Sequence, residues 1–386
     1  MPTIPDDATG ERQPDRLVTE SGAGPRNLAP DQRMHAARLL IQSTALPMTD
    51  VASGAGFSSV RQLTDTVRAA FGTTPAGLRA ARGAVSAMTE PGRLTLSLPV
   101  RVPYAAADLL GFLTHRLVAG VEAAVPGRPG DPVGYARSCA LEHGEAVFTV
   151  AVGAASNGGD RLTVDVELAD LRDLGSLVTR VRRLIDADAE PAAIDEGLSA
   201  DPTLAPLVRR RPGLRVPGTT DPAELAFRAL IGQQVSLAGA AACAARITRS
   251  YGRPLARISD VPGVTHLFPG PAALAEVDPM TLPMPRARGR ALVALAVALR
   301  DETIDLSLGC DRAAARRQLL AQPGIGPWTA DYVLMRGLGD PDVLLRTDLA
   351  IRRELERLEV TATEGWAPWR SYATMHLWHG YLAGEA

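Results

Sequence analysis

A glycine-rich turn in the C-terminal part of the sequence contains residues whose types and spacing suit binding of an anion. It runs Pro323-Gly324-Ile325-Gly326-Pro327 and separates two amphipathic, helix-like stretches within residues 313–339. The glycines let the backbone approach a ligand without a Cβ clash, and Pro327 suits the first position of a helix. The turn amides and the N-terminus of the second helix then form an anion site suited to a DNA phosphate. An ordinary turn between two helices is the alternative.

The sequence around this turn resembles a known family. The turn followed by Thr347-Asp348 resembles the helix-hairpin-helix DNA glycosylase superfamily, and further segments resemble its AlkA-type members, the DNA-3-methyladenine glycosylases II. The resemblance covers about residues 93–386 and implies a monofunctional glycosylase of base-excision repair. Such an enzyme flips an alkylated purine out of duplex DNA, hydrolyses its N-glycosidic bond and leaves an abasic site. The segments are LSLPVRVPY, FRALIGQQVS, PGIGPWTADYVLMRGLGDPD, TDLAIRR and WAPWRSYATMHLW.

The resemblance implies that Asp348 is the catalytic residue. An alkylated purine already carries positive charge and leaves readily, so the enzyme must stabilise the positive charge that develops on the sugar. A fixed carboxylate near C1′ does this electrostatically, and it can also orient or deprotonate the attacking water. Asp348 precedes the apolar pattern LAIRRELERL, so it is equally suited to cap a helix. The two roles can coexist.

Trp328 stands where strand-cleaving members of the superfamily carry a lysine whose amine attacks the sugar. Tryptophan has no amine, so no Schiff base can form there, and its π-face favours a cationic base. Tyr332 shares its helix face. The resemblance implies that Trp328, Tyr332 and Trp378 line the base pocket. Core packing is the alternative, and we expect it for Trp366 and Trp369.

The resemblance also assigns residues that hold the DNA. Gln234 occupies the position of the wedge that fills the space left by the flipped base, although the family has an apolar residue there. A monovalent cation on the carbonyls of Leu320, Gln322 and Ile325 is compatible with the family, and we expect no other metal and no cofactor. The residues expected to bind the DNA backbone, without reading sequence, are Pro323, Gly324, Ile325, Gly326 and Thr329.

An N-terminal segment, residues 30–82, resembles the second helix-turn-helix of AraC-type regulators, in the form found in the Ada alkylation-response regulators. Ser58 is expected to cap its second helix, and Ser59, Arg61 and Gln62 to face a DNA groove. The Ada-type cysteine domain and a complete first helix-turn-helix are missing, so we expect a truncated module. It either recognises a promoter or is a degenerate domain that packs or binds DNA weakly.

A second hypothesis treats the whole chain as a transcription regulator of the alkylation response, with a C-terminal part that senses lesions without cleaving them. A catalytic carboxylate beside the hairpin argues for the enzyme, because a binding protein has no need of one.

The elements that must position these residues define a multidomain fold. A β-hairpin with Asn157-Gly158-Gly159 at its tip is expected, as are helices over Ala105–Val125, Leu174–Ile185, Glu224–Gly252 and residues 287–301, and no strand after Asp221. The predicted parts are a disordered tail (1–29), a helix-turn-helix (30–82), a linker (83–92), an α+β domain (93–205) and an all-α helix-hairpin-helix domain (206–386).

Composition is compatible with this organisation. Apolar residues make up 46% of the 386 residues and the net charge is −2, so affinity for DNA requires local clusters of arginine, as at Arg209–Arg211. Solvated helix faces are the alternative for these clusters. The three cysteines show no metal spacing and are expected to be free thiols in a reducing compartment. We expect a monomer in the cytoplasm, associated with the nucleoid, that binds double-stranded DNA with alkylated bases and no membrane.

Overall fold

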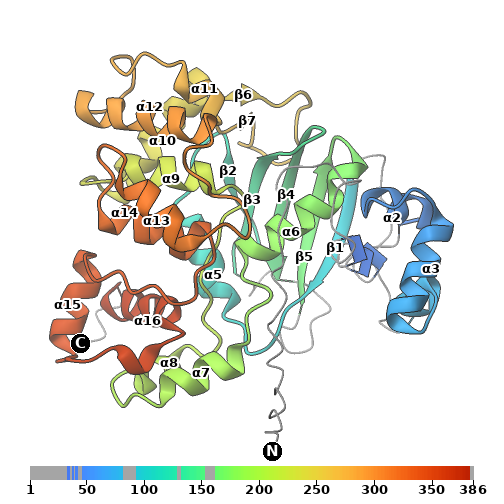
Figure 1. Ribbon diagram of the computed structural model, residues 1–386, viewed down its shortest axis with the longest axis horizontal. Coiled ribbons are helices and arrows are strands. Elements are labelled where there is room, and N and C mark those ends of the chain that lie inside the picture. Colours follow the sequence, from blue (N-terminus) through green and yellow to red (C-terminus); the bar gives the residue numbers. More distant parts are fainter. Residues whose placement is uncertain are drawn as a thin grey trace, which may run out of the picture.

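The computed structural model describes residues 33–34, 37–38, 40–41, 46–80, 93–127, 132–152 and 161–382. Along the chain these residues form a small helical unit, an antiparallel sheet with helices, and a larger group of helices (Figure 1). This order confirms the predicted multidomain fold class. The predicted tail (1–29), the linker (83–92) and the hairpin tip (157–159) lie outside the described residues.

The N-terminal unit contains a helix-turn-helix. α2 (Met48–Gly54) and α3 (Val60–Phe71) are joined by a turn in which Gly56 has a φ of 77°, a conformation that favours glycine. Phe57 is buried beside the turn. α4 (Pro75–Ala80) follows. Figure 1 shows these helices beside one edge of the sheet, away from the larger helical group.

The cap of α3 differs from the prediction. Ser59, and not Ser58, is the N-cap: its hydroxyl accepts the Gln62 amide at 3.2 Å. The Gln62 Oε1 atom in return accepts the amide and the hydroxyl of Ser58, both at 3.0 Å. Ser59 and Gln62 have the Ser-x-x-Gln spacing of a capping box, which explains the shift. Both side chains are therefore engaged in the cap, whereas the Arg61 side chain is 93% exposed.

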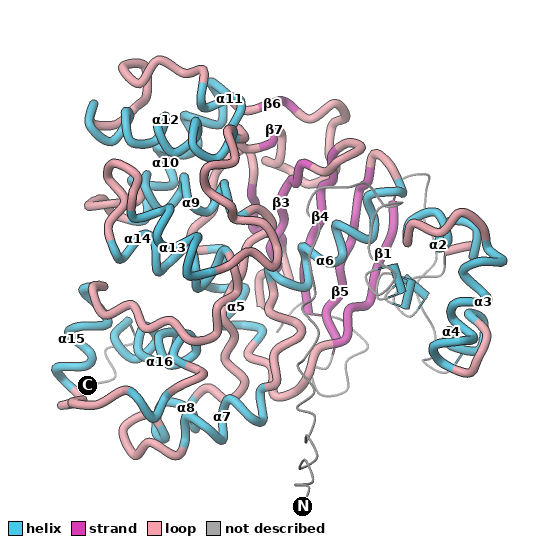
Figure 2. Tube along the Cα trace, viewed as in Figure 1, coloured by secondary structure: helices cyan, strands magenta, loops and turns pink. Residues whose placement is uncertain are grey.

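The middle unit is a five-stranded antiparallel sheet in the order β1-β5-β4-β3-β2 (Figure 2). Burial alternates along β1 and along β5, so one face of each strand packs on the core. β4 and β5 form the expected hairpin. The elements of this unit are β1 (Arg93–Pro99), α5 (Ala106–Thr114), β2 (Glu122–Val125), β3 (Gly134–Ala140), β4 (Glu145–Val152), β5 (Arg161–Leu168), η1 (Leu171–Asp173) and α6 (Leu174–Leu184).

The helix predicted over Ala105–Val125 is wrong in its second half. α5 ends at Thr114, Gly120 has a φ of 94°, and β2 pairs with β3 as an edge strand. The Glu122 carboxylate accepts the Val118 amide at 2.8 Å and enters a buried ion cluster. Strand pairing and these long-range contacts therefore override a locally helical apolar pattern.

The C-terminal unit is almost entirely helical. The prediction of no strand after Asp221 is wrong only for two short pieces that pair with each other, β6 and β7. The elements are α7 (Pro191–Ser199), α8 (Ala205–Arg210), α9 (Pro222–Ile231), α10 (Leu237–Tyr251), β6 (Arg253–Pro254), β7 (His266–Leu267), α11 (Pro271–Ala275), α12 (Arg286–Arg300), α13 (Arg312–Leu320), α14 (Pro327–Tyr332), η2 (Val333–Gly337), α15 (Leu349–Arg357), η3 (Glu364–Trp366) and α16 (Arg370–Leu382).

The single helix predicted over Glu224–Gly252 is wrong, because two helices occupy this segment. α9 ends at Ile231 with Gly232 as its C-cap, Gln234 has a φ of 55°, and the Ser236 hydroxyl caps α10. Serine favours a cap over a helix interior because its side chain hydrogen-bonds the free amides of the first turn. The break exposes a short loop at the tip of the two helices.

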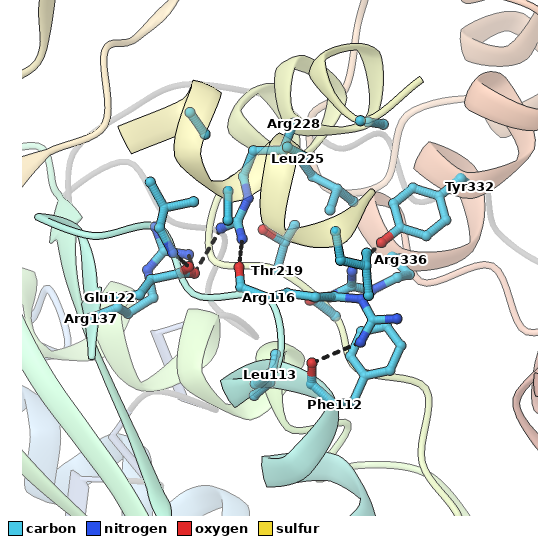
Figure 3. Close-up of a pocket in the computed structure, with 18 of the residues that line it drawn as sticks. Phe112, Leu113, Arg116, Glu122, Arg137, Thr219, Leu225, Arg228, Tyr332 and Arg336 are labelled. Carbon is cyan, nitrogen blue, oxygen red and sulfur yellow. Dashed lines mark hydrogen bonds and ion pairs between the residues drawn. The ribbon is translucent and has the colours of Figure 1, made fainter. Parts of the chain in front are cut away.

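A buried ion cluster joins the sheet to α9 (Figure 3). Arg137 lies 2.5 Å from Glu224 and 3.6 Å from Glu122, and Arg228 lies 2.7 Å from Glu122 and 3.1 Å from Glu224. Although burial opposes ionisation, Arg228 and Arg137 hold the pKa of Glu122 below its usual value. Arg228 also donates to the Arg116 carbonyl at 2.7 Å. The cluster therefore fixes α9 relative to the segment after α5.

Replacing Arg137 with Met should destabilise the chain strongly, because two buried carboxylates would keep a single cation. We expect the free energy of unfolding to fall by about 3–5 kcal/mol. Denaturation followed by tryptophan fluorescence measures this. Arg101→Met is the matched control: it breaks an exposed ion pair with Glu190 and should cost at most about 1 kcal/mol. Equal losses in the two variants would contradict the role of the cluster.

Candidate active site

Asp348 is the point at which three helices meet. As the N-cap of α15, its Oδ1 atom accepts the amides of Ala350 and Ile351 at 2.9 and 3.1 Å, which confirms the predicted cap. Two indoles also donate to this carboxylate. Trp328 Nε1 of α14 reaches Oδ2 at 2.8 Å, and Trp378 Nε1 of α16 reaches Oδ1 at 3.1 Å.

The donors around Asp348 are all neutral. Two are backbone amides and two are indole N–H groups, and no arginine in the described ranges forms an ion pair with this carboxylate. Neutral donors satisfy the lone pairs of a carboxylate and fix its orientation without cancelling its charge. The arrangement therefore presents a fixed negative charge with no counter-ion of its own.

Aromatic rings form a cleft beside this carboxylate. Trp328 and Tyr332 stack with ring centroids 5.0 Å apart, and the Tyr332 and Trp378 centroids lie 6.4 Å apart. The structure thus brings the three predicted pocket residues together. Phe112 of α5 stacks on Trp378 at 6.3 Å. The sequence analysis missed Phe112, because nothing near it in the sequence indicates contact with residues of the C-terminal helices.

The cleft continues into a cavity of about 220 Å³ between the sheet unit and the helical unit (Figure 3). Trp328 and Tyr332 line it from one side and α5 from the other. Several arginines belong to the same lining. The lining includes Phe112, Arg116, Glu122, Arg228, Tyr332 and Arg336.

The two arginines nearest the aromatic rings were also missed from the sequence. Arg336 is buried and donates to the carbonyls of Pro217 and Gly218, at 2.6 and 3.0 Å, and to the Tyr332 hydroxyl. Although burial opposes ionisation of the phenol, the charges of Arg336 and Arg116 lower the pKa of Tyr332. Burial lowers the pKa of Arg116 to about 10, so its guanidinium stays charged at neutral pH.

The predicted helix-hairpin-helix is confirmed. α13 ends at Leu320, and α14 begins at Pro327 with Gly326 as its N-cap. Gly324 has a φ of 77°, and a Cβ there would lie 2.9 Å from the Ala291 Cβ atom, so the turn requires glycine. A Cβ on Gly326 would meet no atom within 4 Å, which leaves the N-terminus of α14 open to a ligand.

The loop between α9 and α10 is attached to this hairpin. Gln233 Nε2 donates to the Gly324 carbonyl and to the Thr329 hydroxyl, both at 2.9 Å. Thr329 is buried, so its side chain is not presented at the surface for the expected phosphate contact. Gln234, the predicted wedge, is exposed at the loop tip. Sequence reasoning missed the tie made by Gln233, because it joins segments far apart in the chain.

Comparisons with known proteins agree with this architecture. The family model described as the AlkA N-terminal domain matches residues 95–221, and a helix-turn-helix domain model matches residues 8–81. DNA-3-methyladenine glycosylase 2 of Escherichia coli is 35% identical over 74% of this chain and 97% of its own length. The chain belongs to the AlkA family of DNA glycosylases.

This AlkA-family chain is also similar to a second sequence relative and to a solved structure. The probable bifunctional transcriptional activator/DNA repair enzyme AlkA of Mycobacterium tuberculosis is 44% identical over 95% of this chain and 74% of its own length. The solved 3-methyladenine DNA-glycosylase of Archaeoglobus fulgidus has a TM-score of 0.60 at 17% identity, over 74% of this chain and 97% of that one. The second likeness supports the fold.

The two remaining tryptophans of this AlkA-family chain, Trp366 and Trp369, lie apart from the aromatic cleft. Trp366 is buried and donates to an Asp201 carboxylate oxygen at 2.6 Å, which confirms core packing. Trp369 is half-buried and meets Tyr372 edge-on, with centroids 6.1 Å apart. Neither residue forms one of the ring contacts of the cleft.

The described residues show neither a metal centre nor a disulfide bond. Among the described residues, no group of His, Cys, Asp or Glu side chains could hold a metal ion, and no helix is long and apolar enough to cross a membrane. The three cysteines are free thiols, as predicted. The monovalent cation on the carbonyls of Leu320, Gln322 and Ile325 stays a prediction.

Proposed function

We propose that this chain is a monofunctional DNA glycosylase that flips alkylated purines of the 3-methyladenine type from duplex DNA, hydrolyses the N-glycosidic bond and leaves an abasic site. The observation that carries the proposal is the Asp348 carboxylate, held by four neutral N–H groups at an aromatic cleft. The relative in Escherichia coli bears the name DNA-3-methyladenine glycosylase 2. A single chain supplies every group of the site, so the proposed reaction, at the nucleoid in the cytoplasm, needs no second copy.

The chemistry follows from charge. An alkylated purine leaves as a neutral base, and the sugar gains positive charge as the bond lengthens; a nearby fixed carboxylate stabilises that charge. Oδ1 of Asp348 already accepts three hydrogen bonds, whereas Oδ2 accepts only the one from Trp328 within the described residues. Oδ2 is therefore the oxygen with room for the sugar or for a water. The π-faces of Trp328 and Tyr332 hold the cationic base.

The DNA grip combines the hairpin with the α9–α10 loop. The amides of Gly324 and Gly326 bind a phosphate at the start of α14, next to Trp328. The Ile325 amide instead donates to the Gln322 carbonyl at 3.2 Å within the turn. Gln234 enters the duplex as the base leaves. Its neighbours Val235 and Leu237 are 45% and 56% exposed and line the same cavity, so they supply the apolar surface that glutamine lacks.

Asp348→Asn should abolish base release and keep DNA binding. The amide has the shape of the carboxylate but no charge, so we expect the rate of release to fall on the order of 100-fold or more. Single-turnover incubation with methylated duplex DNA, followed by hot alkali to cut abasic sites, measures release. Release at the normal rate would end the catalytic assignment.

The control for this variant is Asp311→Asn. Asp311 caps α13 through the same pair of amide contacts but lies outside the cleft. Asparagine caps as well as aspartate, so both variants should stay folded, and Asp311→Asn should release bases normally. If both variants lost base release, the loss in Asp348→Asn would be attributed to impaired helix capping and not to catalysis.

The absence of strand cleavage rests on amine chemistry. All 41 residues counted as lysine or arginine are arginine, so the chain has no lysine side chain to form a Schiff base. We therefore expect borohydride to trap no adduct between the wild-type chain and abasic DNA. Trp328→Lys is the positive control, because it places an amine beside Asp348 and should give an adduct. A trapped wild-type adduct would contradict monofunctional chemistry.

A second activity is favoured by the N-terminal unit. The helix-turn-helix model match and the name of the relative from Mycobacterium tuberculosis, a transcriptional activator and repair enzyme, support sequence-specific DNA binding by α3. Arg61 is the exposed predicted contact, since Ser59 and Gln62 are engaged in the cap.

If α3 recognises a promoter, the chain should protect a site in its own promoter from nuclease cleavage. Arg61→Ala should lose this footprint and keep base release, whereas Asp348→Asn should keep the footprint. A wild-type chain that leaves no footprint would favour a degenerate module.

A further inference from the structure

Arg116 is a cation on the cavity lining without an anionic partner among the described residues. Its guanidinium carbon lies 3.6 Å from the centroid of the Phe112 ring, and Nη1 donates to the Phe112 carbonyl at 3.0 Å. Within the described ranges, Nε and Nη2 have no acceptor and no carboxylate pairs with this side chain. Figure 3 shows Arg116 between Phe112 and the side chains of Tyr332 and Arg336.

The other charged groups on the cavity lining have partners. Glu122 accepts Arg228, the Tyr135 hydroxyl and the Val118 amide, so its charge is already matched by other donors. Arg336 donates through three nitrogens to two carbonyls and a hydroxyl. A partly buried charge without a partner is costly, so Arg116 needs a reason to be there.

Its geometry matches a ligand with paired acceptors. A guanidinium is a planar fork that donates two parallel hydrogen bonds, and a purine with a carbonyl at position 6 offers O6 and N7 as adjacent acceptors. This is the commonest specific pairing of arginine with a base. A 6-aminopurine presents an N–H donor at position 6 and cannot form that pair.

We propose that Arg116 is a specificity-determining residue, which favours flipped purines that carry a carbonyl at position 6 over those that carry an amino group. The proposal rests on the proposed glycosylase function and refines it. Trp328 and Tyr332 hold any flipped purine through their π-faces, and Asp348 acts on the sugar of each. Arg116 alone distinguishes the far edge of the base.

The test compares two lesions that form together in methylated duplex DNA. 3-Methylguanine and 3-methyladenine carry the same methyl group at N3 and the same positive charge, and both keep N7 free. They differ at position 6 and in the 2-amino group of guanine. Chromatography of the released bases gives both initial rates from one reaction, and the quantity measured is their ratio.

Arg116→Met should lower the ratio of 3-methylguanine to 3-methyladenine release on the order of 10-fold, because it removes the paired donors and keeps the apolar stem on Phe112. Arg116→Lys keeps the charge but loses the planar fork, so it should also lower the ratio. Arg249→Met, at the exposed end of α10, should leave it unchanged.

An unchanged ratio in Arg116→Met, or in Arg116→Lys where the Met variant does not fold, would overturn the proposal while both bases are still released. Failure of the wild-type chain to release either base would instead refute the glycosylase function. The two failures are therefore distinct: the first leaves the ratio of the two rates unchanged while both bases are released, and the second removes both rates.

Discussion

The site depends on one constraint: a carboxylate must remain charged and remain still beside a sugar. Asp348 meets it through neutral donors alone, two amides at the start of α15 and the indoles of Trp328 and Trp378. An arginine in their place would fix the oxygens equally well and cancel most of their field at the substrate. Preorganised neutral dipoles leave that field available where positive charge develops. The same aspartate caps α15, so the position of the charge is as rigid as the helix.

The other elements serve to bring this charge and the DNA together. The hairpin turn that offers its amides to a phosphate begins α14, and Trp328 is the second residue of that helix. Gln233 ties the turn to the α9–α10 loop, and the buried cluster of Glu122, Arg137, Glu224 and Arg228 ties α9 to the sheet. The hairpin, the α9–α10 loop and the cavity beside Trp328 are thus parts of one connected framework.

Local rules made part of this architecture predictable. The hairpin, the start of α14 at Pro327, the cap at Asp348 and the shared face of Trp328 and Tyr332 all follow from residues close together in the sequence. Two segments were mispredicted as helix. The edge strand β2 forms because it pairs with β3, and the break before Ser236 forms where Gln234 adopts a left-handed conformation. Phe112 and Arg116 enter the cavity from another unit of the chain, so no local pattern could place them beside α14.

The central claim is that the negative charge of Asp348 acts on positive charge at the sugar, and binding of abasic analogues tests it without any bond breaking. A duplex with a cationic pyrrolidine in place of the deoxyribose carries that charge, and a tetrahydrofuran duplex is its neutral counterpart. The wild-type chain should bind the cationic duplex more tightly, on the order of 100-fold, and Asp348→Asn should bind the two duplexes nearly equally. The same preference in both proteins would contradict the account.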